Sequence, residues 1–300
     1  MKLSVFMVTY NQERFIRQAI ESVVKQKVSY DYEVIIGEDC STDGTAAICD
    51  EYAERYPFIK VFHHNPNKGL VKNWEFVLSH CKGDYVAMLE GDDYWIDEYK
   101  IQKQADWLDN HPDFSIVCSN IDVVYEGTDC RKEDIFPKRE QRAYAAGEVL
   151  KDWIVLTSSV MFRNNHNPIV YPKAVYVNDT YTFLQIMREG KCFLFGEQMT
   201  AYRRHDGNIT RTELDIQSDV KWAIQYTYFT KHLYSRELRL MASSREDEWL
   251  QCVINAPAEV EGVLRCRMRY MQKHPRLLFS PFFKRTILHY TPIRKLRKHK

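Results

Sequence analysis

The sequence has no long apolar segment. Nowhere in its 300 residues do apolar side chains continue for the roughly 18 positions that a membrane-spanning helix needs. The opening residues, MKLSVFMVTYNQ, also lack the long apolar region and the small-residue cleavage site of a signal peptide. We therefore expect a cytoplasmic protein.

Two common binding motifs are missing as well. The eight cysteines show neither CxxC pairs nor the spacing of a zinc site, which favours reduced, mostly buried thiols. No GxGxxG follows an apolar run, and this absence argues against a dinucleotide-dependent oxidoreductase.

The composition that is present is typical of a globular protein, with 45% hydrophobic and 28% charged residues. The chain length favours a core domain with a smaller appended unit. A formal net charge of +1 conceals a basic end, because the residues from Leu264 onward include 12 Lys or Arg and no Asp or Glu. The residues before Leu264 contain 30 basic against 41 acidic side chains, so the last part of the chain is chemically distinct.

Apolar, β-rich runs alternate with helical patterns along the first 111 residues. Strands are expected at 3–10, 32–38, 59–64 and 84–90, and helices at 13–26, 45–56, 70–81 and 99–111. Four such strand–helix units predict an α/β fold with a mainly parallel sheet flanked by helices.

The remaining pattern is less regular. We expect a pair of strands within 114–125, a charged surface loop at 126–142, strands at 158–163, 192–196 and 198–204, and a helix at 180–190. From about residue 212 onward the pattern is mainly helical.

Polar side chains follow three of the expected strands directly. Because parallel strands present their carboxyl ends at one edge of a sheet, these side chains should meet in one cleft. Adjacent carboxylates repel one another unless a cation compensates, and oxygen ligands suit Mg²⁺ or Mn²⁺. The residues concerned are Thr9, Tyr10 and Asn11, then Glu38 and Asp39, and then Glu90 to Asp93.

Four segments in order, VTYN, GEDCSTDGT, NKGLVKNW and EGDDYW, resemble the nucleotide-sugar-binding half of a family 2 glycosyltransferase with a GT-A (Rossmann-like) fold. Each segment alone is a weak signal, whereas the ordered set is specific. The resemblance covers about residues 1–210 and implies inverting transfer from a nucleotide-diphosphate sugar, a UDP-sugar, to a hydroxyl acceptor in cell-surface glycan or polysaccharide biosynthesis.

The resemblance also implies a domain organisation. Residues 1–211 would form the GT-A catalytic domain, with a nucleotide-sugar-binding half at 1–110 and an acceptor or catalytic half at 111–211. Residues 212–300 would form a helical C-terminal region that ends in the basic tail.

Individual roles follow from the same resemblance. Tyr10, between Thr9 and Asn11, would stack on the nucleobase, and Asp39, next to Glu38, would accept the imide hydrogen of the base. Lys72 and Asn73 would lie near the nucleotide. Asp92 would face the ribose, and Asp93 would hold Mn²⁺ or Mg²⁺.

Two further residues complete the implied site. Asp179 corresponds to the catalytic base, with a helix N-cap as its structural alternative. His205, in YRRHDGNIT, corresponds to a histidine that reaches the metal or the diphosphate.

Other functions stay open at this point. A nucleotidyltransferase would need a glycine-rich loop after the first strand, where the sequence reads TYNQERF, and a catalytically silent nucleotide-sugar-binding module would not need the carboxylates. The missing QxxRW motif argues against a processive synthase.

The acceptor would be a glycan or a lipid-linked glycan. The basic tail interleaves apolar and cationic residues, so it would either pack on the protein or attach it peripherally to an anionic inner membrane face. We expect no nucleic-acid partner, because no recognised binding motif accompanies the charge.

Overall fold

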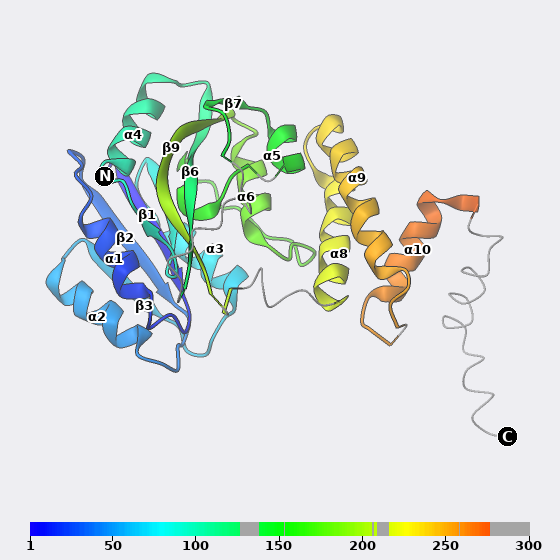
Figure 1. The fold of residues 1–300 in the computed structure, drawn as a ribbon, viewed down its shortest axis with the longest axis horizontal. Coiled ribbons are helices and arrows are strands. Elements are labelled where there is room, and N and C mark those ends of the chain that lie inside the picture. Colours follow the sequence, from blue (N-terminus) through cyan, green and yellow to red (C-terminus); the bar gives the residue numbers. More distant parts are fainter. Residues whose placement is uncertain (127–137, 153, 206, 209–215, 258, 277–300) are drawn as a thin grey trace. The chain divides into compact units, whose positions relative to one another are not determined.

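The computed structural model describes residues 1–126, 138–152, 154–205, 207–208, 216–257 and 259–276. Its strands form one nine-stranded sheet with the order β3-β2-β1-β4-β8-β6-β9-β5, in which β7 pairs with β9 (Figure 1). The strands are β1 (Leu3–Thr9), β2 (Tyr32–Glu38), β3 (Ile59–His63), β4 (Tyr85–Glu90), β5 (Tyr94–Trp95), β6 (Phe114–Tyr125), β7 (Arg142–Tyr144), β8 (Met161–Arg163) and β9 (Lys191–Arg204).

The described helices fall between and after these strands. They are α1 (Ile16–Val24), α2 (Thr45–Arg55), α3 (Leu70–His80), α4 (Lys100–Asn110), α5 (Ala146–Asp152), the 3₁₀ turn η1 (Thr157–Ser159), α6 (Asn178–Ile186), α8 (Ile216–His232), α9 (Arg236–Val253) and α10 (Val263–Lys273). None of the described helices is long and apolar enough to cross a membrane.

The four strand–helix units predicted from periodicity are present, and β3, β2, β1 and β4 pair in parallel. The α/β fold is therefore confirmed. Beyond β4 the sheet is mixed, because β8 runs antiparallel to both β4 and β6.

Two expected strand breaks are absent. Residues 114–125 form the single strand β6, and 191–204 form the single strand β9, which pair in parallel over their whole length. Shifts in register around Asn120 absorb the irregularity, and its amide donates hydrogen bonds to the carbonyl oxygens of Gly196 and Arg139. The polar segment that looked like a break is a bulge inside a continuous ladder.

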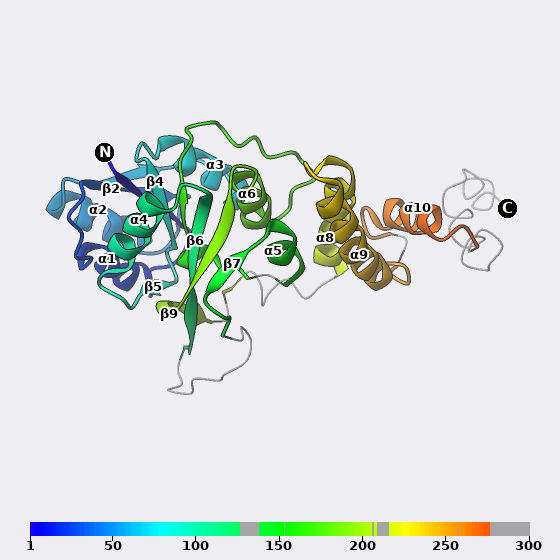
Figure 2. The same cartoon turned by 90° about the horizontal axis from the view of Figure 1, so that it is seen from above.

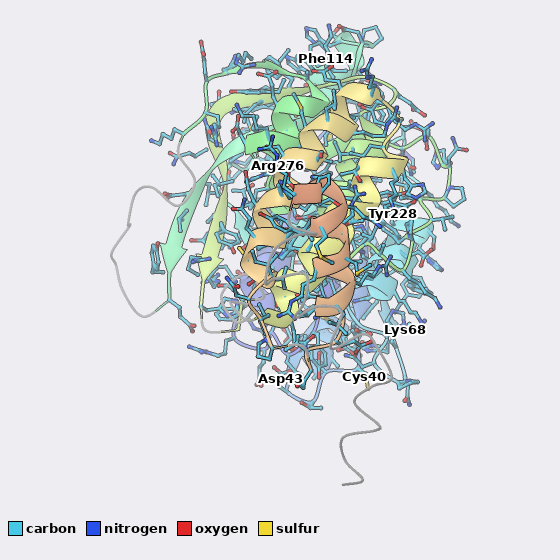
Figure 3. The ribbon with its side chains drawn as sticks, turned by 90° about the vertical axis from the view of Figure 1, so that its right-hand side faces the viewer. Cys40, Asp43, Lys68, Phe114, Tyr228 and Arg276 are labelled. Atoms are coloured by element: carbon cyan, nitrogen blue, oxygen red, sulfur yellow. The ribbon has the colours of Figure 1, made fainter. Side chains whose placement is uncertain are left out.

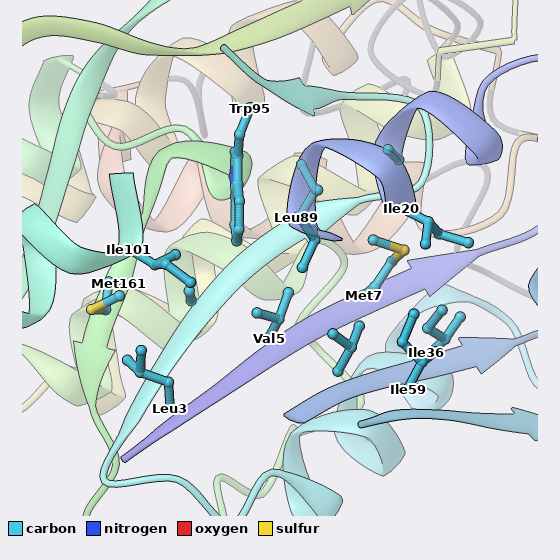
Figure 4. Close-up of a cluster of buried hydrophobic side chains, with 14 of the residues drawn as sticks. Leu3, Val5, Met7, Ile20, Ile36, Ile59, Leu89, Trp95, Ile101 and Met161 are labelled. Atoms are coloured by element: carbon cyan, nitrogen blue, oxygen red, sulfur yellow. The ribbon is translucent and has the colours of Figure 1, made fainter. Parts of the chain in front are cut away.

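Both faces of the sheet are covered by helices (Figure 1, Figure 2). Along β1, Leu3, Val5 and Met7 pack with α1, α2 and α4, as Figure 4 shows for one cluster. The alternate residues Phe6 and Val8 pack with α3, α5 and α6. This period of two is the geometry of a strand buried on both faces, and it holds the carboxyl ends of the strands rigidly.

The chain divides into two compact units, residues 1–172 with 177–205, and residues 173–176 with those from 206 onward. In the second unit, α8, α9 and α10 pack around Val220, Leu250 and Val263. The domain boundary predicted near residue 211 falls outside the described residues. Most of the expected loop at 126–142 and the tail from residue 277 also lie outside them.

Candidate active site

The loop after β1 is tied to the loop after β2. Asn11 has a left-handed backbone (φ 51°), which asparagine tolerates better than most residues, and its Oδ1 accepts a hydrogen bond from the Thr42 N–H at 2.8 Å. The Thr9 hydroxyl donates to Gln12 Oε1 at 2.8 Å. Tyr10 stands between these anchored residues with 47% of its surface exposed, so its ring is available to a ligand.

Asp39, at the end of β2, is buried and fixed by the backbone. The N–H groups of Lys68 and Gly69 donate to its two carboxylate oxygens at 2.7 and 2.8 Å. Cys40 and Asp43, which follow β2, and Lys68, which follows β3, are labelled in the lower part of Figure 3. The carboxylate of Asp39 is therefore held in one orientation before any ligand arrives.

Neighbouring predicted residues have buried partners of their own. Glu38 is buried with Oε2 3.2 Å from His63 Nδ1. Asn73 is also buried, and its Nδ2 donates to the Gly37 carbonyl oxygen at 2.8 Å, while Lys72 beside it is exposed on the first turn of α3. A side chain at position 37 would collide with Asn73, which explains the glycine.

Asp93 lies at the centre of a hydrogen-bond network and is only 1% exposed. Its Oδ2 accepts from the Ser158 hydroxyl at 2.6 Å, and its Oδ1 accepts from the Arg203 backbone N–H at 2.9 Å. Burial, and then the charge of Asp92, raise the pKa of Asp93 well above its ordinary value against these hydrogen bonds. Both oxygens of Asp93 are thus engaged by protein donors.

Asp92 contacts the predicted histidine instead. Its Oδ2 lies 3.1 Å from His205 Nε2, and the Arg203 Nε donates to its backbone carbonyl oxygen at 2.8 Å. His205 is 8% exposed and packs with its ring centroid 4.5 Å from that of Phe15. A partly exposed carboxylate and an oriented imidazole thus stand side by side.

Glu90 joins this group; its place at a strand end puts it among the carboxylates expected in the cleft, without an individual role. Burial, followed by the charges of Asp92, Asp93 and Asp179, raises the pKa of Glu90 well above its ordinary value. The spacing of Glu90 and Asp92, two acids separated by one residue at a strand end, is the signal that could have given Glu90 a role of its own. Ser158 was missed, and nothing in its local sequence distinguishes it.

Asp179 enters from α6. The cap position of this helix belongs to Val177, so Asp179 lies in the first turn and the N-cap alternative does not hold. Its Oδ1 accepts from the N–H of Thr180 at 2.5 Å, and burial raises the pKa of Asp179 to about 6. Asn178 beside it donates to the Val71 carbonyl oxygen, which ties α6 to α3.

Asp92, with Glu90 and Asp93 nearby, offers the carboxylate oxygens that a divalent cation such as Mg²⁺ or Mn²⁺ prefers, and His205 adds an imidazole nitrogen. No three His, Cys, Asp or Glu side chains of the described residues form a complete metal-binding group. Mg²⁺ usually takes one or two carboxylates and completes its shell with water and substrate phosphates. The residues present therefore suit a cation that binds together with a diphosphate.

Comparison with known proteins identifies the family. The family model described as Glycosyl transferase family 2 matches residues 4–168, which include Asp92 and Asp93 and end before Asp179. An uncharacterised protein of Mycobacterium tuberculosis is 35% identical over 205 residues, 68% of this chain. The chain spans 59% of the length of that relative.

Solved structures share the fold. TarS of Staphylococcus aureus (residues 1–349) in complex with UDP-GlcNAc matches with a TM-score of 0.66 and 18% identity, covering 91% of this chain and 81% of that chain. The mannosyltransferase PcManGT of Pyrobaculum calidifontis, in complex with GDP-Man and Mn²⁺, matches with a TM-score of 0.58 and 15% identity, covering 96% and 84%. The fold is therefore GT-A, and the family match over more than half of the sequence shows that the chain belongs to glycosyl transferase family 2.

Proposed function

We propose that this chain transfers a sugar from a UDP-sugar to a hydroxyl acceptor with inversion at the anomeric carbon. The observation that carries the proposal is the meeting of Glu90, Asp92 and Asp93, at the end of β4, with Asp179 from α6. A cluster of this kind suits chemistry in which a cation and a proton acceptor act on one substrate.

The donor nucleotide would bind at the ends of β1 and β2. Tyr10 offers an exposed ring for stacking, and Asp39 offers a carboxylate already oriented by two backbone amides. Each carboxylate oxygen can accept more than one hydrogen bond, so Asp39 retains capacity for the imide of uracil. The choice of UDP is supported by TarS, whose structure contains UDP-GlcNAc.

Asp92 and His205 would hold Mn²⁺ or Mg²⁺, which when bound supplies positive charge against the departing diphosphate. The sequence predicts this role for Asp93. Asp92 is the more exposed of the two acids and lies beside His205, so we propose it as the ligand and give Asp93 a positioning role, in which it ties the end of β4 to Ser158 and to β9.

Asp179 would act as the general base. The acceptor oxygen bonds to the anomeric carbon from the face opposite the diphosphate, the bond from that carbon to the diphosphate oxygen breaks, and the hydroxyl proton passes to Asp179. A pKa of about 6 keeps this carboxylate ionised at neutral pH and close to the value that favours proton transfer there.

The acceptor class is proposed from a relative. TarS, a poly(ribitol-phosphate) beta-N-acetylglucosaminyltransferase, is 33% identical over 113 residues, 37% of this chain and 19% of the TarS sequence. We infer that this chain also modifies a cell-surface polymer or a lipid-linked precursor of one. Such an acceptor would be consistent with a cytoplasmic enzyme attached peripherally to the membrane.

The test is a panel of UDP-sugars and GDP-mannose, with nucleotide release followed with and without Mn²⁺. Asp92→Asn and Asp93→Asn form a matched pair, because each removes one charge from adjacent positions. We expect Asp92→Asn to weaken Mn²⁺-dependent UDP binding at least tenfold, and Asp93→Asn to weaken it far less.

If Asp93→Asn instead weakens Mn²⁺-dependent UDP binding and Asp92→Asn does not, Asp93 holds the metal, as the sequence predicts. A wild-type protein that binds UDP with Mn²⁺ but releases nucleotide from no donor would be a silent binding module, and the proposed transfer would be rejected.

A further inference from the structure

A cavity of about 190 Å³ lies between α8 and α10 in the second compact unit. On α8 the lining residues recur at spacings of three and four, and on α10 they form a broader stripe that includes adjacent residues. The lining residues are Ile224, Thr227 and Lys231 from α8, and Arg265, Cys266, Met268, Arg269 and Gln272 from α10.

The lining carries three cations and no carboxylate. Arg269 is fixed by the fully buried Glu246, with its Nε 2.7 Å from Oε1, and Lys273 binds the same carboxylate at 3.0 Å. Lys231 and Arg265 are exposed, and among the described residues no carboxylate pairs with either. The lining therefore carries two cations that no ion pair among the described residues neutralises.

The structure points to a binding site for a phosphate ester in this cavity, which goes beyond the proposed sugar transfer. Lys231 and Arg265 would bind the phosphate oxygens as charge-assisted donors, and the Gln272 amide would add a neutral donor. Ile224 and Met268 offer an apolar wall for the carbon chain of the ester.

The size of the cavity limits the ligand. Sites for drug-sized ligands measure roughly 300–1,000 Å³, so a smaller cavity suits a single headgroup and excludes a whole nucleotide sugar. A phosphate ester of this size has two sources, the headgroup of a phospholipid and a soluble molecule or polymer that carries phosphate.

The experiment measures binding of sn-glycerol 3-phosphate to the full chain by calorimetry at low salt, with glycerol as the uncharged control. The test variant is Lys231→Gln with Arg265→Gln, both at exposed positions. The matched control is Lys221→Gln with Arg236→Gln, which removes two exposed cations from the same unit outside the cavity. We expect at least a tenfold loss of affinity in the test variant and less than a twofold loss in the control.

Co-sedimentation with vesicles of phosphatidylglycerol and phosphatidylcholine identifies the source. Loss of sedimentation in the test variant but not in the control assigns the site to a lipid headgroup, whereas binding of glycerol 3-phosphate alone assigns it to a soluble phosphate ester. Nucleotide release from the sugar donor should be the same in all three proteins, which separates this site from the transfer site.

Two results would overturn the inference. One is a wild-type protein that binds neither probe at low salt, and the other is an equal loss of binding in test and control variants, which would indicate unspecific attraction to charge. Thermal unfolding of each variant shows that the three-helix unit is intact.

Discussion

Replacing Asp179 with asparagine tests the proposed base directly, because the amide keeps the shape of the side chain but does not accept the proton. With a pKa of about 6, the ionised fraction of Asp179 rises about tenfold between pH 5 and pH 7. Wild-type turnover should rise by a similar factor over this interval. Loss of a general base typically costs about 10²–10⁴ in rate, and the variant should also lose this pH dependence.

The assay is steady-state release of UDP from a saturating donor between pH 5 and pH 8, with donor binding measured separately by calorimetry. Donor affinity should change less than turnover, since Asp179 acts on the acceptor.

The stability of the variant provides the control. Burial raises the folded-state pKa of Asp179 above its ordinary value of 3.8, so ionisation destabilises the fold as pH rises through about 4 to 6. The asparagine variant should therefore be at least as stable as the wild type at pH 7. A variant that is both slow and less stable would not support Asp179 as the general base.

Full turnover in Asp179→Asn, or an unchanged pH profile, would refute the reasoning.

The remaining predictions use other parts of the chain. Tyr10→Ala should leave thermal stability unchanged and weaken UDP binding about tenfold or more in calorimetry, since stacking on a base contributes about 1–3 kcal/mol; unchanged affinity would exclude stacking. Asn73→Ala should destabilise the protein by about 1–3 kcal/mol in chemical unfolding, because the Gly37 carbonyl oxygen loses its buried donor. Glu246→Gln should destabilise the protein by about 1–3 kcal/mol, because Arg269 loses its buried carboxylate whereas Lys273 keeps Asp247. Although burial opposes ionisation, hydrogen bonds lower the pKa of Glu246. The stabilisation by this carboxylate is therefore present above about pH 4.5 and should be lost as the pH falls further. A free energy of unfolding that does not change below about pH 4.5 would contradict this. A chain ending at Arg276 keeps α10 and should lose sedimentation with anionic vesicles if the tail attaches to membranes; equal sedimentation of both lengths would remove the tail from the interaction.

The sequence by itself determined the elements whose signals are local. The apolar run of β1, which is buried along its whole length, and the i, i+3, i+4 spacing of Ile16, Ala19 and Ile20 in α1 are patterns within a few neighbouring residues. The same holds for the polar residues that end β1, β2 and β4. Once four strand–helix units are recognised, the parallel order requires these ends to share one edge, so the location of the site could be predicted without coordinates.

The tertiary structure decided which carboxylate faces outward. Asp92 and Asp93 are adjacent and chemically identical, and they differ only in their distant partners. Asp93 is held by Ser158, 65 residues away, and by Arg203, 110 residues away, while Asp92 meets His205 across 113 residues. No local pattern encodes such contacts, because they depend on how β4, η1 and β9 pack.

The same reason explains the other differences. The Asn73 side chain is committed to the backbone of β2, 36 residues away, and α10 belongs to a packed unit through Glu246, 23 residues before Arg269. The basic composition of the C-terminal region was readable from the sequence alone. That α8 and α10 bring Lys231 and Arg265 to one cavity followed only from the way these two helices pack. Burial between distant segments decides which side of each helix is left open.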